Sequence, residues 1–280
     1  TFINEVSEDL AILKGRVDGL EVKQNEFEAG GFSDTTVLDG KAVFDVGSVD
    51  TEDDTYTGET QFMYTYTMNL NTSFTGDDNL YTRIKTGNHS SWSKTKSDYN
   101  TYLSSGNGNG DVLEVDKLWY TTPVGENHTV TIGPKIENYY MHATTPSIYE
   151  PVLKAFTLGG NAAAYGASTS PGIGWAYTAD NGFAISSNIT SKNPVFTDQA
   201  AQSWATQVGY TQSNYSVSAL VNMKYNGWTD SYFMSSNGKA RPGDGHSTNI
   251  GLRGWYRKTE YSTAMPSIKV GFDLYLIHIT

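Results

Sequence analysis

The most constraining feature of the sequence is a strict alternation of side-chain type between residues 61 and 87. From 62 to 71, aromatic and aliphatic residues occupy the even positions, and mostly polar residues occupy the odd ones. A period of two predicts a β-strand with one apolar and one polar face. A polar turn at 75–79 and a second alternating stretch at 80–87 complete a predicted antiparallel hairpin. Its polar face carries Arg83 and Lys85.

Two architectures accommodate a hairpin of this length. A transmembrane β-barrel uses strands of about nine to eleven residues, with apolar side chains towards lipid and polar ones towards the lumen. A large soluble β-sandwich also has alternating strands, but its apolar face is buried. The hairpin alone leaves both architectures open.

Composition excludes several classes of protein. A chain of 280 residues can bury a large core or close a wide barrel. Its net charge of -11 argues against nucleic acid as a partner. No stretch approaches the roughly eighteen consecutive apolar residues that a helical membrane span needs. Cysteine is absent, so neither a disulfide framework nor a thiolate metal site is expected.

The two ends suggest a piece of a longer protein. The chain begins at Thr1, without an initiator methionine and without the basic and apolar regions of a signal peptide. It ends inside an alternating apolar segment, 268–279. We therefore expect residues to be missing on both sides.

Residues 1–31 follow a different period, which predicts a coiled-coil helix and a linker. Apolar residues recur at heptad spacing, as the a and d positions of a coiled coil require. The flanking pairs Asp9–Lys14, Arg16–Glu21 and Lys23–Glu28 are opposite in sign, as a parallel coil favours. The mixture of core residues admits a trimer without excluding a dimer, and a single amphipathic helix packed on its own domain is the alternative. The predicted core positions are Ile3, Val6, Leu10, Leu13, Val17, Leu20, Gln24 and Phe27.

Residues 32–280 are predicted to form one β-domain of about eleven strands. Mixed parity at 112–122 indicates a β-bulge. Short turns at 180–182 and 213–214 alternate with long polar connections, of which 89–111 is expected to be an exposed loop. Short turns at one end and long loops at the other are typical of outer-membrane barrels. The asymmetry therefore favours the barrel over the sandwich.

One long segment, 136–170, interrupts the alternation. It is rich in Pro, Gly, Ala and aromatic residues, and is too apolar for an ordinary surface loop. Long segments without strand pattern are usually functional. Either it folds into a barrel and narrows it, or it is an ordinary packed excursion.

Charged residues on the polar faces and in this segment are the candidate pore lining. Basic residues on one wall and acidic residues on an inserted segment would orient small ions. The alternative is that these charges are simply solvated. The candidates are Arg83, Lys85, Glu137, Glu150, Lys154, Lys224, Arg253 and Arg257.

Enzyme chemistry has little support in the sequence. The five histidines show no metal-ligand spacing, and neither a nucleophile elbow nor a phosphate-binding loop is present. No catalytic residue, metal or cofactor is therefore predicted. The competing hypothesis is a trimeric fibre or adhesin with a coiled-coil stalk and a soluble, glycan-binding β head, which would purify without detergent.

Several short motifs occur in the order in which a known family has them. The junction 16–21 before 32–36 resembles the linker that enters the barrel of cyanobacterial outer-membrane porins. Further similar segments are 70–76, 82–88, 116–120 with 123–125, and 129–133. The chain thus resembles porins with a surface-layer-homology domain, which are related to the carbohydrate-selective (OprB) porins and are sometimes labelled iron-uptake porins.

The resemblance implies an N-terminal domain that binds peptidoglycan, then a coiled coil, then a barrel of about sixteen strands in the outer membrane. It also implies a homotrimer that passes inorganic ions and small hydrophilic solutes. The chain departs from the family because the peptidoglycan-binding domain is absent, about eleven strands cannot complete that barrel, and Thr280 is not a terminal aromatic residue. We interpret these departures as truncation, with the coil and linker at 1–31 and a partial barrel at 32–280.

Overall fold

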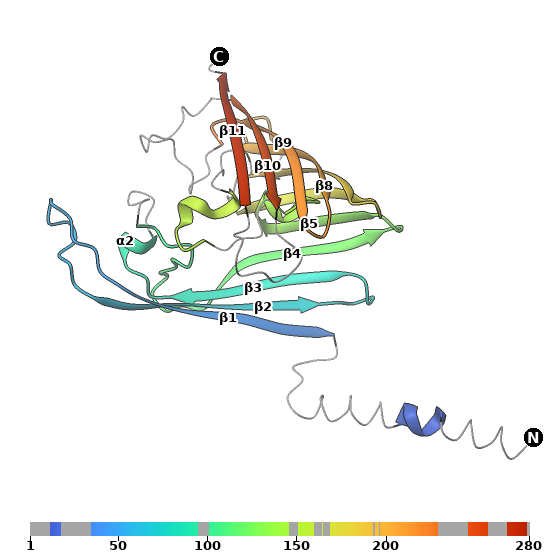
Figure 1. Cartoon of the computed structure of the whole chain (residues 1–280), viewed down its shortest axis with the longest axis horizontal. Coiled ribbons are helices and arrows are strands. Elements are labelled where there is room, and N and C mark those ends of the chain that lie inside the picture. The colour runs from blue at the N-terminus through green and yellow to red at the C-terminus, as the bar shows by residue number, and fades with distance from the viewer. Residues whose placement is uncertain are drawn as a thin grey trace, which may run out of the picture.

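In the computed structural model, the described strands form one antiparallel sheet, and each strand pairs with the next in the chain, from β1 to β11. The sheet curls from the blue β1 to the red β11 around the yellow-green segment that follows β5 (Figure 1). It is one continuous layer, so the described residues do not form the alternative β-sandwich. The structure describes residues 12–17, 35–94, 101–145, 151–159, 164, 169–192, 194–195, 197–228, 246–256 and 268–278.

The strands are about as long as the alternation in the sequence predicts. They are β1 (Thr36–Gly47), β2 (Gln61–Thr72), β3 (Asn79–Gly87), β4 (Glu114–Val124), β5 (His128–Ile136), β6 (Ser170–Thr178), β7 (Phe183–Ser191), β8 (Gln202–Thr211), β9 (Tyr215–Tyr225), β10 (His246–Tyr256) and β11 (Ile268–His278).

Short and long connections alternate along most of the sheet. The short ones, 73–78, 125–127, 179–182 and 212–214, leave the even-numbered strands from β2 to β8. The long ones, 48–60, 88–113, 137–169, 192–201 and 226–245, leave the odd-numbered strands from β1 to β9. Because the strands are antiparallel, these five long connections emerge at one end of the sheet, which agrees with the predicted asymmetry from β1 to β10. The connection 257–267 after β10 is also long and leaves the opposite end.

The helices in the described residues are short. One covers 12–17, before the sheet. The long connections contain α2 (Ser91–Lys94), η2 (Asn138–Met141) and η3 (Lys154–Gly159). None of the helices in the described part of the chain has the length and apolarity needed to cross a membrane.

The two faces of the sheet have opposite character, and the polar face is the buried one. We call the face that carries Thr65, Asn188 and Asn222 the inner face; these side chains are 4%, 3% and 0% exposed. The outer face carries apolar residues such as Phe62 and Val221, which are 70% and 40% exposed. Along β9, exposed and buried residues alternate from Tyr215 to Asn222. Soluble domains bury the apolar face instead.

A β-bulge interrupts β4, as the mixed parity predicted. Arg83 on β3 lies opposite Lys117, whereas the next residue, Ile84, lies opposite Val115. Asp116 therefore has no partner on β3, and a bulge of this kind locally breaks the alternation of side chains. As a result the carboxylate of Asp116 lies on the inner face, 3.4 Å from the ammonium group of its neighbour Lys117.

The sheet is not closed within the described residues. There, β1 pairs only with β2, and β11 pairs only with β10. The observed fold is therefore an open, curled, antiparallel sheet, and closure into a barrel remains a prediction.

The predicted coiled coil lies mostly outside the described residues. Residues 12–17 form a helix, and its core positions Leu13 and Val17 are 59% and 46% exposed. The positions Ile3, Val6, Leu10, Leu20, Gln24 and Phe27 belong to the part that is not described. Exposed Leu13 and Val17 are compatible with a further helix packing there, but the coil stays a prediction.

Candidate functional site

Parts of two long connections pack against the inner face rather than extending into solvent. The first is 88–113, which contains the predicted exposed loop 89–111; that expectation is wrong. His89, Trp92 and Tyr102 in this connection are only 2%, 7% and 4% exposed. Figure 1 shows α2 on the concave side of the sheet, above β2 and β3.

Inner-face side chains of β1 and β2 bind this first segment. The His89 Nε2 atom lies 2.9 Å from the Asp45 carboxylate, which also accepts a 2.8 Å hydrogen bond from the Ser105 hydroxyl. The Thr65 hydroxyl donates to the Ser105 carbonyl at 2.7 Å, and the Trp92 indole donates to Gln61 at 3.1 Å. A polar wall supplies these donors and acceptors, so a polar segment can be buried against it.

The second segment is 137–169, and its described parts also lie along the inner face. Gln207 on β8 holds the backbone of Thr144 at both groups: Thr144 N donates to Oε1 at 3.0 Å, and Nε2 donates to Thr144 O at 3.1 Å. The Asn222 amide donates to the Ala164 carbonyl at 2.7 Å, and the Ser186 hydroxyl accepts from Ala143 N at 3.1 Å. The described parts thus support the hypothesis that this segment narrows the space inside the sheet.

Glycine on β6 allows the second segment to approach the wall closely. A Cβ atom placed on Gly174 would lie 2.8 Å from Met141 Cβ and 2.9 Å from Asn188 Cβ. Both distances are shorter than real Cβ contacts. The small residues that alternate with Ile173 and Trp175 on this strand therefore have a packing role.

A cluster of charges forms where the second segment meets β3 and β4. Arg83 donates from Nε to Asp116 Oδ2 at 2.6 Å and also contacts this oxygen through Nη2. Its Nη1 donates to the Tyr140 hydroxyl at 3.2 Å. Lys117, 2% exposed, lies 3.1 Å from Glu137 Oε1, and the Thr169 hydroxyl donates to the same oxygen at 3.3 Å. The cluster therefore joins two strands of the wall to the inserted segment.

Lys85 and Lys154 add two more cations to this cluster. Lys85 lies on the inner face of β3, two residues beyond Arg83, and is influenced by the charges of Arg83 and Lys154. Lys154 begins η3, a helix that also lies against β11. Burial lowers the pKa of Lys154 below its ordinary value, and the nearby Glu137 carboxylate acts in the opposite direction.

A second titratable group of the inserted segment carries no charge at neutral pH. Burial lowers the pKa of His142 to about 3, so its imidazole is neutral under ordinary conditions. The Asn188 amide lies 3.3 Å from His142 Nδ1. His142 therefore adds polarity but no charge to the inner wall.

Aromatic rings stack beside the charges. Tyr81 and Trp119 lie opposite each other on β3 and β4, with ring centroids 4.2 Å apart. Tyr140 continues the stack, 4.8 Å from Trp119, and Tyr139 lies 4.4 Å further. Trp119 is 8% exposed, whereas Tyr140, between Trp119 and Tyr139, is 38% exposed.

The structure brings together only some of the predicted pore-lining residues. Arg83, Lys85, Glu137 and Lys154 share the cluster. Lys224 and Arg253 lie on the inner face of β9 and β10, 1% and 5% exposed, and none of the contacts described for the cluster involves them. Glu150 and Arg257 lie outside the described residues.

Sequence reasoning missed Asp116, Lys117 and Tyr140 as members of the site. The sequence did contain a signal for Asp116 and Lys117, because these adjacent, oppositely charged residues lie in the stretch where the alternation of side chains is interrupted. Tyr140 had no comparable signal, because its position depends on how the second segment folds back onto β3.

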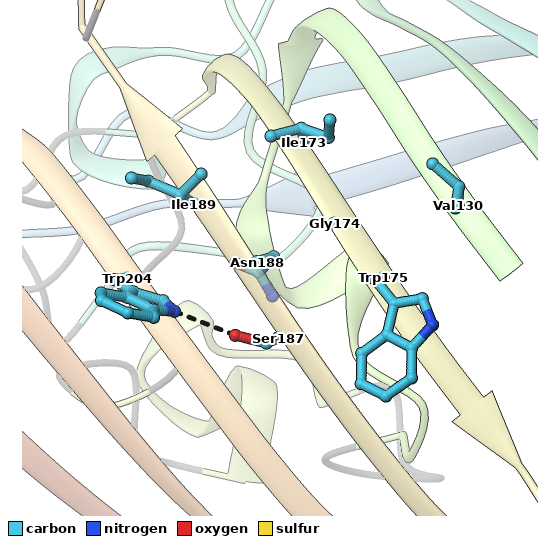
Figure 2. A pocket seen from close by; sticks show the side chains of 8 residues that line it. All are labelled: Val130, Ile173, Gly174, Trp175, Ser187, Asn188, Ile189 and Trp204. Atoms are coloured by element: carbon cyan, nitrogen blue, oxygen red, sulfur yellow. Dashed lines mark hydrogen bonds between the residues drawn. The ribbon is translucent and has the colours of Figure 1, made fainter. Parts of the chain in front are cut away.

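A hollow on the outer face has a different character. It has a volume of about 440 Å³ and lies among Val130, Ile173, Trp175, Ser187, Ile189 and Trp204. Figure 2 shows Trp175 and Trp204 on either side of Ser187, with the Trp204 indole donating to the Ser187 hydroxyl at 2.9 Å. Ser187 also shares a 3.0 Å hydrogen bond with Thr206. The Ser187 hydroxyl and the Trp204 indole of this hollow are therefore hydrogen-bonded within the wall. The rest of the lining is mainly apolar, as elsewhere on the outer face.

An antiparallel sheet with a buried polar face and an exposed apolar face is characteristic of the class of proteins that includes transmembrane β-barrels. A model of the carbohydrate-selective porins of the OprB family matches residues 2–253. The chain therefore belongs to the OprB family of porins, which are outer-membrane channels and not enzymes.

Curated relatives come from two cyanobacteria. The chain is 37% identical over 130 residues to an uncharacterized protein of Nostoc sp. strain PCC 7120. It is 35% identical over 131 residues to an uncharacterized protein of Synechocystis sp. strain PCC 6803. The aligned parts cover 43% and 45% of this chain, but only 23% of the length of each relative.

Similar solved structures include an outer-membrane protein and a porin. A loop-deletion mutant of OmpT from Vibrio cholerae has a TM-score of 0.46 and 10% identity, over 88% of this chain and 71% of that one. A mutant of the Rh. blastica porin has a TM-score of 0.41 and 10% identity, over 86% of this chain and 84% of that one.

Proposed function

We propose that the chain forms part of the wall and the constriction of a passive, water-filled channel in the outer membrane. The channel would admit inorganic ions and small hydrophilic solutes, carbohydrates among them. The observation that carries this proposal is the reversed burial of the sheet, with a polar inner face and an apolar outer face. Membership in the carbohydrate-selective porin family supports it independently.

The outer face suits an acyl environment better than water. Apolar area exposed to water carries a free-energy penalty of about 25 cal/mol per Å² relative to an apolar surrounding. Aromatic residues of the outer face also gather near the short turns, where an interfacial girdle is expected. These residues include Tyr120, Trp175, Tyr177, Phe183, Tyr210 and Tyr215.

The inner charges supply the selectivity of the proposed channel. The cluster holds four cations, Arg83, Lys85, Lys117 and Lys154, against the two carboxylates of Asp116 and Glu137. An excess of positive charge at a constriction raises the local concentration of anions. We therefore expect the narrow region to favour anions, although the chain as a whole is acidic.

The proposal extends to the intact protein. Its barrel would contain about sixteen strands, so further strands would close the gap between β1 and β11. The N-terminal coil would assemble a homotrimer and connect it, through a preceding domain, to peptidoglycan. Cyanobacterial relatives support a cyanobacterial source for this arrangement.

Conductance of the full-length native protein in planar lipid bilayers tests the proposal. We expect stepwise, ohmic currents, and a reversal potential in a KCl gradient that indicates anion preference. Arg83→Gln should lower the chloride-to-potassium permeability ratio about twofold or more, because it removes a cation and leaves Asp116 with Lys117 as its remaining ion pair. Arg83→Lys should retain most of the preference.

Lys41→Gln is the matched control, since Lys41 lies exposed on the inner face of β1, two strands from Arg83. It should change the permeability ratio much less than Arg83→Gln. A protein that is soluble without detergent and produces no current would contradict the channel and favour an adhesin head.

A further inference from the structure

The paired strands β3 and β4 place rings and charges in a defined order along the inner face. Their register sets Tyr81 opposite Trp119, then Arg83 opposite Lys117, then Lys85 opposite Glu114. Residues two apart on one strand are separated by about 7 Å. Along the wall, an aromatic pair is followed by a cationic pair and then by Lys85. The distance from the cationic pair to Lys85, about 7 Å, is comparable to the length of one hexose ring with a substituent.

The charges along this order are only partly compensated. Asp116 bonds to Arg83, and Glu137 bonds to Lys117. Within the described residues, the ammonium group of Lys85 makes neither a hydrogen bond nor an ion pair. Arg83 lies two residues away on the same face of β3, and Lys117 lies opposite Arg83, so two cations neighbour Lys85, whereas Glu114 lies opposite it. An incoming anionic group at Lys85 would offset the repulsion between these cations.

The aromatic part of the same site offers a partly accessible ring. Tyr140 lies between Trp119 and Tyr139, with ring centroids 4.8 and 4.4 Å away, and is still 38% exposed. Its hydroxyl is held by Arg83, so the ring has a fixed position beside the cations. The exposed part of an aromatic ring beside hydrogen-bond donors suits the apolar C–H groups and the hydroxyls of a sugar ring.

We propose that this part of the inner wall is a subsite for anionic sugars. The sugar ring packs on Tyr140, Arg83 donates to its hydroxyls, and its phosphate or carboxylate group lies at Lys85 with Lys154 nearby. This inference rests on the proposed channel and specifies a class of solute for its constriction. A neutral sugar would leave Lys85 without a partner, and an inorganic anion would leave the ring of Tyr140 unused.

Block of ion current by added solutes tests the subsite in the full-length protein. The probes are glucose, glucose 6-phosphate, glucuronate and inorganic phosphate, each titrated against single channels in KCl. We expect glucose 6-phosphate and glucuronate to reach half-maximal block at concentrations about tenfold lower than those of glucose or phosphate. Using both acids separates the need for an anionic group from the need for a phosphate in particular.

Three variants assign the effect to residues. Lys85→Gln should weaken block by both anionic sugars about five- to tenfold and leave block by glucose unchanged. Tyr140→Leu should weaken block by every sugar and leave block by phosphate unchanged. Lys41→Gln, the same substitution on the inner face of β1, should alter none of these constants by more than about twofold.

Each outcome has a distinct meaning. Equal block by glucose and the anionic sugars, or equal block by phosphate and glucose 6-phosphate, would overturn the subsite while leaving the channel intact. So would unchanged block in Lys85→Gln, provided that its single-channel conductance shows a folded channel. Absence of any current from the native protein would instead overturn the proposed channel.

Discussion

Gln207 shows how a single buried side chain can position an inserted segment. It is 1% exposed and bonds to both backbone groups of Thr144, as a neighbouring β-strand residue would. A buried backbone group that loses its partner costs about 1–3 kcal/mol. Gln207 therefore fixes the second segment at a point well away from the charge cluster of β3 and β4.

We expect Gln207→Ala to loosen this segment without unfolding the sheet. The Thr144 N–H and carbonyl would lose their partners, so the segment should fluctuate and open-channel current noise should rise severalfold. Recordings of single channels at fixed voltage measure this directly. Gln212→Ala is the control, because Gln212 bonds instead to Asn181 in a short turn. Noise equal to that of the native channel in Gln207→Ala would contradict the positioning role.

At this scale the sequence predicted the inner-face charges of the strands better than those of the inserted segments. Arg83, Lys85, Lys224 and Arg253 all lie on the polar face that parity predicts. Parity says nothing about distance along a curved sheet, so it could not separate the first two from the last two. Membership of the cluster depends on long-range contacts such as that between Arg83 and Tyr140.

The short turn between β2 and β3 is an element held by one carboxylate. Asp78 Oδ1 accepts from the backbone N–H of Phe74 and of Thr75, at 2.9 and 2.8 Å. The hydroxyls of Ser73 and Thr75 also donate to this oxygen, and the Tyr120 hydroxyl donates to Oδ2 at 2.7 Å. These hydrogen bonds, above all that from the Thr75 backbone, lower the pKa of Asp78 below its ordinary value.

The sign of the pH dependence follows from this shift. A carboxylate whose pKa is lower in the folded state stabilises the fold above its unfolded pKa, which is near 4. That contribution is lost as the pH falls below about 4 towards the lowered pKa of the folded state.

We therefore expect the melting temperature in detergent to fall between pH 5 and pH 3 more steeply for the native protein than for Asp78→Asn. The variant should melt lower than the native protein at pH 7, because its amide replaces one acceptor oxygen with a donor. Circular dichroism melts over this pH range provide the measurement. Asp77→Asn, a change at the neighbouring exposed carboxylate, should behave like the native protein. Parallel pH profiles for native protein and Asp78→Asn would contradict this role.

At the scale of elements, the strands were predictable, whereas an inward path was predicted only for 136–170, and there as one of two alternatives. Alternation in stretches such as 61–72 and 215–225 marks strands whatever lies on either side. The connection 88–113 was misassigned as an exposed loop because polar composition normally indicates contact with water. Inside a polar wall that rule fails, since inner-face groups such as Asp45 and Thr65 bond to the segment as water would.

At the scale of the whole molecule, the open edges of the sheet and its apolar outer face are both expected if the sheet is part of a transmembrane barrel. An unpaired strand edge in lipid would leave backbone groups without partners, so a transmembrane sheet has to close on itself. Within the described residues β1 and β11 are the two edges, and the alternation of short and long connections already separates the two ends of a barrel. The sequence predicted this directionality because connection lengths are read directly from it, whereas closure is absent from the pairing of the described strands and stays a prediction.

The most direct test of the account is the environment of alternate residues on β9 in a lipid bilayer. The sequence has no cysteine, so single cysteines at 217, 219 and 221 and at 216, 218 and 222 can each carry a fluorescent label. If the inner face lines an aqueous channel, brominated lipids should quench the labels at the outer-face positions 217, 219 and 221. A water-soluble quencher should instead reach the labels at the inner-face positions 216, 218 and 222. Quenching that does not alternate, or lipid quenching at the inner-face positions, would contradict the assignment of the inner face to an aqueous channel.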